Sequence, residues 1–221
     1  MLSRAFSFCL CATLAGVAAF VVSAETDSRV AVAEARLGGL ALGVSSPLPM
    51  PFGRAQLLAT LDSCALSLSR ETTQFLGPAQ LRATKRNCSD FAQTVSRHWP
   101  RFGAAALLEA ALAAQGGDTA LFQEKITQAQ QFAPNQGWQA MRRVALIGEF
   151  SRNLGGDPMD FEPPLNDDLA LMLSIQPGAE ALARYYDSAP HLRDAISNAV
   201  KAAARADQTR FFNLIRLQNL S

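Results

Sequence analysis

The chain has 221 residues, of which 49% are hydrophobic and 18% are charged, and its formal net charge is +1. So large an apolar fraction can bury a core, which excludes a disordered chain. Acidic and basic residues are interspersed, without the basic stripe and interleaved aromatics of nucleic-acid-binding proteins, so we expect no nucleic-acid partner. Strand-forming residues are sparse while Ala, Leu, Gln and Arg are abundant, which favours an all-α fold.

The N-terminal segment carries the most specific pattern in the chain. Arg4 is followed by an uncharged stretch over residues 5–24, which ends in Val22-Ser23-Ala24 before Glu25. A basic start, an apolar run and small residues before a charge are typical of a signal peptide in residues 1–24. A run of this length can also stay uncleaved as a membrane anchor, and a buried N-terminal helix is a further alternative. We expect a periplasmic or otherwise extracytoplasmic body, attached to the inner membrane through residues 5–24 if the segment is retained.

Cleavage after Ala24 would leave two cysteines, Cys64 and Cys88. Each lies on one of two consecutive predicted helices, joined by a turn near 72–77. Antiparallel helices would bring the two thiols to comparable heights, and an exported domain favours a disulfide between them. The alternative is two separate buried thiols.

The middle of the chain reads as a series of helices behind a spacer. Residues 25–52 predict a short helix over 29–37 and then an extended segment with three alternate prolines, Pro47, Pro49 and Pro51. Residues 53–154 form the predicted core, and 155–221 a helical extension. After two helices between residues 54 and 99, we expect helices over 103–115, 119–132, 136–154, 166–174, 177–187, 190–204 and 207–219. No segment shows the alternation of a strand.

The order over 103–134 is helix, Gly-Asp turn, helix and proline, and 34 residues separate Pro100 from Pro134. This pattern resembles a tetratricopeptide repeat, a 34-residue helix–turn–helix unit. The residues that carry the resemblance are Ala110, Gly117, Asp118, Ala129 and Pro134. The large aromatic residue usual in the first helix of such a unit is Ala106 here. The alternative is an irregular helical bundle.

The resemblance implies a stack of helix pairs that binds a protein partner. It also implies a groove along the first helix of each unit, lined over 103–115 by Ala104, Leu107, Ala111, Ala114 and Gln115. On the next helix, Trp138, Met141 and Arg142 are the candidate partner-binding residues, because Trp and Arg are common interface anchors. The alternative for Trp138 is core packing.

Residues with catalytic or metal-binding chemistry are scattered. The two histidines, His98 and His191, have no partner at ligand spacing, and Asp157, Asp160 and Glu162 lie in a proline-rich loop that matches no calcium motif. Tyr185 and Tyr186 read as packed tyrosines at a helix end. We therefore expect no catalytic residues, no metal and no cofactor.

The sequence predicts an exported or membrane-anchored all-α protein with a repeat-like stack, which mediates protein–protein interaction or assembly at the cell envelope. One alternative is a purely structural helical subunit of an envelope complex. An enzyme of unknown type is the second alternative, and we expect the chain not to be an enzyme.

Overall fold

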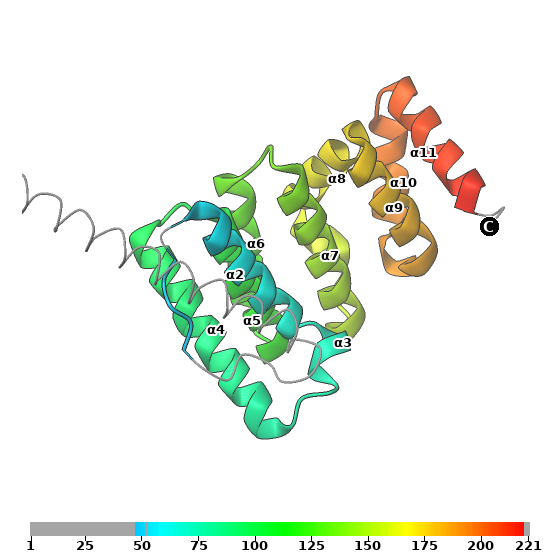
Figure 1. The fold of residues 1–221 in the computed structure, drawn as a ribbon. Helices are drawn as coiled ribbons and strands as arrows, with labels where there is room; N and C mark the ends of the chain where they lie inside the picture. Colours follow the sequence, from blue (N-terminus) through cyan, green and yellow to red (C-terminus); the bar gives the residue numbers. More distant parts are fainter. Residues whose placement is uncertain (1–46, 52, 219–221) are drawn as a thin grey trace, which may run out of the picture. The chain divides into compact units, whose positions relative to one another are not determined.

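The computed structural model describes residues 47–51 and 53–218, and within these ranges the chain is helical without a strand. The predicted all-α fold is therefore confirmed (Figure 1). The predicted signal segment 1–24 and the short helix 29–37 lie outside the described residues. Over the part that the structure describes, no helix combines the length and the hydropathy that a membrane span requires.

Most helix boundaries lie within two residues of the predicted ones. The α-helices are α2 (Arg54–Ser67), α3 (Arg70–Thr73), α4 (Pro78–His98), α5 (Gly103–Gly116), α6 (Thr119–Phe132), α7 (Gly137–Leu154), α8 (Pro164–Ser174), α9 (Gln176–Ser188), α10 (Arg193–Ala202) and α11 (Arg205–Gln218). Two short 3-10 helices, η1 (Pro158–Phe161) and η2 (Pro190–Leu192), join them. α3 overlaps the start of the predicted turn at 72–77, and the predicted helix 190–204 divides into η2 and α10.

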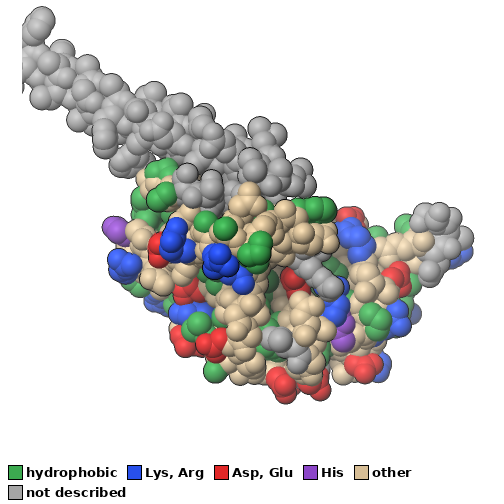
Figure 2. Space-filling model, turned by 90° about the horizontal axis from the view of Figure 1, so that it is seen from below, with side chains coloured by type: hydrophobic (Ala, Val, Ile, Leu, Met, Phe, Trp, Pro, Cys, Tyr) green, Lys and Arg blue, Asp and Glu red, His purple; other side chains and the backbone are tan. Residues whose placement is uncertain are grey.

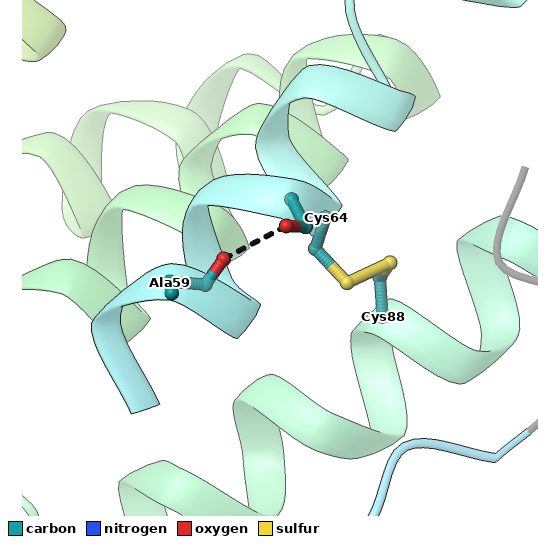
Figure 3. Close-up of a disulfide and its surroundings, with 4 residues drawn as sticks. Ala59, Cys64 and Cys88 are labelled. Atoms are coloured by element: carbon teal, nitrogen blue, oxygen red, sulfur yellow. Dashed lines mark hydrogen bonds between the residues drawn. A yellow bond between two sulfur atoms is a disulfide. The ribbon is translucent and has the colours of Figure 1, made fainter. Parts of the chain in front are cut away.

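The chain divides into two compact units, Met1–Val95 and Ser96–Ser221, and the division falls near the end of α4. The first unit contains α2, α3 and most of α4. Cys64 of α2 and Cys88 of α4 form a disulfide with a Cα–Cα distance of 5.7 Å, and both residues are fully buried (Figure 3). The predicted disulfide is therefore confirmed, and it joins the two long helices of this unit.

In the second unit, α5 and α6 form the helical hairpin that the sequence predicts. Gly117 ends α5 with φ at 72°, in the left-handed region that glycine adopts without a Cβ clash. Asp118 caps α6, since its carboxylate accepts a hydrogen bond from the Leu121 amide at 3.0 Å. The Gly-Gly-Asp turn therefore ends one helix and starts the next.

A single hydrophobic core continues from α5 to α11 within the second unit. Three phenylalanines anchor one end of it: the Phe122 and Phe150 rings stack at 4.1 Å between centroids, and Phe161 meets Phe122 edge-on at 5.3 Å. The rings come from the start of α6, the end of α7 and η1. The predicted boundary between core and extension, after Leu154, thus falls inside one continuous core.

A buried ion pair ties α7 to α8. The guanidinium of Arg143 donates two hydrogen bonds of 2.6 Å to the carboxylate of Asp168, and both side chains are 0% exposed. Arg143 also donates to the backbone carbonyls of Ala129 and Ala133 at the end of α6, at 3.2 and 3.5 Å. One side chain therefore joins three helices, and it gives a second donor to two carbonyls at the end of α6 that also accept the amides of Ala133 and Gln136.

Candidate functional site

The three predicted partner-binding residues lie on one side of α7. Trp138, Met141 and Arg142 are spaced at i, i+3 and i+4, which places their side chains on one face of a helix. All three are half-buried, and Met141 packs against the core. The predicted alternatives for Trp138 are a surface anchor and a core residue. Its burial is intermediate, so it matches neither alternative fully.

The groove predicted along α5 is not exposed. Ala104, Leu107 and Ala111 are 6%, 6% and 7% exposed, and Ala114 packs against the core. The prediction assumed that one side of this helix faces solvent. Because the helix is built of Ala and Leu on nearly every side, all of residues 103–108 are buried instead. The face of α7 is therefore the part of the predicted site that remains accessible.

The opposite side of α7 is held rigidly. Ala140, Val144 and Ile147 are fully buried in the core, and Arg143 is locked in its ion pair with Asp168. Burial raises the pKa of Asp168 above its usual value, against the opposing effect of the hydrogen bonds and charge of Arg143. The adjacent residue Arg142 is thus carried on a helix that the core and the Arg143–Asp168 pair hold in place, as a preorganised binding site requires.

The charge of Arg142 affects the pKa of Tyr185, a residue of α9 that is distant from it in sequence. Burial raises the pKa of the Tyr185 phenol above its ordinary value of 10.0, while the positive charges of Arg184 and Arg142 act in the opposite direction. Tyr185 itself packs against the core, as predicted for a helix-end tyrosine. The charges of Arg142 on α7 and Arg184 on α9 therefore both favour the ionised phenol, and the two helices pack together.

Sequence reasoning missed Arg143, Asp168 and Arg184. A signal for the first two exists in the helical period. Arg143 stands between Ala140, Val144 and Ile147 in the buried stripe of α7, and Asp168 stands beside Leu165, Leu169 and Met172 in the buried stripe of α8. Opposite charges in the buried stripes of two consecutive helices indicate a buried ion pair. The electrostatic effect of Arg142 on Tyr185 depends on how α9 packs against α7, and the sequence offers no comparable pattern for it.

Other candidate groups are dispersed. His98 is exposed at the end of α4, and His191 is half-buried in η2. Asp157, Asp160 and Glu162 are exposed around η1. Among the described residues, no group of three or more His, Cys, Asp or Glu side chains is placed to hold a metal ion.

The first unit contains a cavity of about 370 Å³ between the proline-rich segment and α4. It is lined by Pro47, Leu48, Met50, Arg86, Asn87, Asp90, Phe91 and Thr94. Arg86 and Asp90 stand one helical turn apart at its rim and are both exposed, so its polar lining carries both signs of charge. This lining selects neither an anion nor a cation.

No protein-family model matches the chain, and no curated protein or solved structure matches it either.

Proposed function

We propose that the chain is an exported or membrane-anchored helical protein that binds a protein partner, or assembles with one, at the cell envelope. The observation that supports this proposal best is the surface shared by α7 and α9. Arg142 and Arg184 there act electrostatically on Tyr185, and Tyr185 and Met141 pack against the same core. Arg, Tyr and Trp are the residue types most often found as energetic anchors of interfaces.

The rigidity of this surface favours binding. A side chain on a fixed helix loses less freedom when a partner docks than one on a mobile loop, and this lowers the entropic cost of association. The Arg143–Asp168 pair and the core residues of α7 supply that rigidity. The tetratricopeptide-like arrangement of helix pairs, also proposed here, is one in which exposed helix faces serve as partner sites.

The partner site is tested by photo-crosslinking in intact cells, with a photoreactive residue in place of Ala145, which is half-buried on the same face of α7 and leaves Arg142 in place. A matched control carries the same residue in place of Asn153, which is exposed near the other end of α7. We expect a discrete adduct from position 145 and none from position 153. Equal adducts from both positions, or none from either, would remove this face from the site.

A second measurement separates binding from folding. Arg142→Ala should leave the melting temperature nearly unchanged, because substitutions away from buried features change stability by about 0.5 kcal/mol or less. It should reduce recovery of the crosslinked partner. Lost recovery together with a collapsed melt would show that Arg142 is structural.

Export is tested independently of the partner. A reporter that is active only outside the cytoplasm, fused after Ser221, should be active in the full chain, because the proposal places the body there. Activity of a cytoplasmic reporter at the same position, with an inactive export reporter, would contradict it.

A further inference from the structure

The turns at one end of the second unit contain no acidic residue. Three segments meet at this end: 96–102 (SRHWPRF), 132–138 (FAPNQGW) and 174–178 (SIQPG). A Cβ placed on Gly103 would lie 3.1 Å from the Cβ of Ala133 and 2.5 Å from Oε1 of Gln139, so the first two segments adjoin. A Cβ on Gly137 would collide with Ile175, so the third adjoins the second.

The first of these segments is basic, aromatic and open to solvent. Arg97, His98, Trp99, Pro100 and Arg101 are five consecutive exposed residues. Trp99 is 44% exposed, and its ring lies 5.9 Å from that of His98. Trp138 lies in the first turn of α7 at the same end, and Arg142 follows one turn later. We name the exposed run Arg97–Arg101 the basic turn.

The opposite end of the unit has the reverse charge. The stacked rings of Phe122, Phe150 and Phe161 bring segments 116–120 and 155–163 together there. These segments carry four exposed carboxylates and no Lys or Arg: Asp118, Asp157, Asp160 and Glu162. The turns at the two ends therefore differ in charge, with Glu180 one helical turn beyond the first end, bonded to Gln176, and Arg152 in the last turn of α7 before the second. On the face of the molecule drawn in Figure 2, acidic and basic side chains both occur.

Carboxylates further along the helices are engaged by their own partners. Glu109 of α5 pairs with Lys125 at 2.8 Å and accepts a hydrogen bond from Ser96, also at 2.8 Å. Asp167 of α8 accepts a hydrogen bond from Gln130. Neither group pairs with Arg97 or Arg101 in the structure, so the positive charge of the basic turn is directed to solvent.

We propose that the basic turn contacts the headgroups of an anionic lipid bilayer. Arginines near such a surface are attracted to it, and tryptophan prefers the interface between headgroups and acyl chains, where its ring and its N–H are both accommodated. The acidic end of the unit would be repelled from the same surface, so the unit would approach the membrane in one orientation. This inference does not rest on the proposed partner site.

Two arginines attract a free protein only weakly, at about fivefold in affinity for each. Attachment through residues 5–24, if retained, would hold the unit close to the bilayer and raise its effective concentration there. The contact would then orient a body that is already at the membrane, rather than recruit it from solution.

The test uses the full chain in vesicles and Trp99 as the reporter. The chain has two tryptophans, so Trp138→Phe leaves Trp99 alone. The vesicles consist of phosphatidylcholine with or without phosphatidylglycerol, and they include a phosphatidylcholine that is spin-labelled on its headgroup. Circular dichroism first confirms that each variant is folded.

We expect the spin label to quench Trp99 more strongly as phosphatidylglycerol is added, and high salt to reverse the increase. Arg97→Gln with Arg101→Gln should weaken the attraction of the basic turn to the anionic vesicles about 25-fold, about fivefold for each charge, and so reduce the increase in quenching. Arg152→Gln, a matched control in the last turn of α7, should leave it unchanged. Quenching that does not respond to phosphatidylglycerol, or that falls equally in the control, would overturn the proposal. A response of Trp99 to polyglutamate but not to anionic vesicles would also overturn it and assign the basic turn to an acidic protein.

Discussion

Arg143 and Asp168 meet in a two-pronged ion pair from which solvent is excluded. Its two hydrogen bonds are 2.6 Å long, and both side chains are 0% exposed. Taking two charges out of water is costly, and only close, fully bonded geometry offsets that cost. Arg143 meets this condition because its remaining donors bind carbonyls of α6. The pair therefore makes the arrangement of α6, α7 and α8 specific, whether or not it adds net stability.

Replacing one partner of this pair should lower the free energy of unfolding much more than replacing both. We expect Asp168→Leu to lower the free energy of unfolding by about 3–5 kcal/mol, because it leaves a buried guanidinium without its counter-charge. Arg143→Met together with Asp168→Leu should recover most of this loss, since two apolar side chains of similar volume replace the pair. Urea unfolding of the two single variants and the double variant measures the coupling. Additive losses would contradict the explanation.

Local patterns predicted the helices well because the residues that end or cap a helix lie next to it in the sequence. Gly116-Gly117-Asp118 contains both the left-handed glycine that ends α5 and the carboxylate that caps α6. The disulfide was predictable for a similar reason: the two long helices that carry Cys64 and Cys88 are separated in the sequence only by a short connection that contains α3. These features depend on short stretches of chain and on the simplest connection between two helices.

The accessible surface was harder to predict because it depends on packing between distant segments. Ala104 and Ala111 were expected in a groove but are buried, and a helix composed of alanine offers no polar face that would indicate its exposed side. Arg142 and Arg143 are adjacent and chemically identical, yet one serves the surface and the other the core. Only the position of Arg143 in the stripe of Ala140, Val144 and Ile147 distinguishes them.

Removal of the disulfide should destabilise the first unit. Cys64 and Cys88 are 24 residues apart, and closing a loop of that length restricts the unfolded chain by about 3 kcal/mol in the chain-entropy model. We expect Cys64→Ala with Cys88→Ala to unfold at a lower urea concentration than the oxidised wild type. The free energy of unfolding should fall by about 3 kcal/mol. Wild type treated with a reductant is the control and should approach the variant. Mass mapping without reductant should find the two cysteines joined, and two freely alkylated thiols in the folded protein would contradict the bond.

Alkaline titration should reveal the raised pKa of Tyr185. The pKa of Tyr185 is raised in the folded protein, so the phenol stays neutral there at a pH where the unfolded chain already ionises. Its contribution to stability is complete below about pH 10, the usual tyrosine pKa, and is lost as pH rises through the folded value. Ultraviolet absorbance of tyrosinate should show a late step that Tyr185→Phe removes. Arg142→Ala should move that step to still higher pH, because a positive charge that favours tyrosinate is lost, whereas Arg152→Ala should not move it.

The close approach of α8 and α9 gives the sharpest test of packing. Gly178, near the start of α9, is buried, and a Cβ placed on it would lie 2.5 Å from the carbonyl oxygen and 2.7 Å from the Cα of Met172. Backbone atoms cannot swing aside as a side chain does, so Gly178→Ala must push the two helices apart. We expect a loss of about 1–3 kcal/mol, the usual cost of overpacking.

Gly116 provides the matched control for this substitution. It lies in the last turn of α5, and a Cβ added to it would meet nothing within 4 Å. Gly116→Ala should therefore stabilise the protein by up to about 1 kcal/mol, because alanine loses less backbone freedom than glycine when it enters a helix. Urea unfolding of both variants beside the wild type gives the comparison. If Gly178→Ala were as stable as Gly116→Ala, the contact between α8 and α9 would be looser than the structure shows.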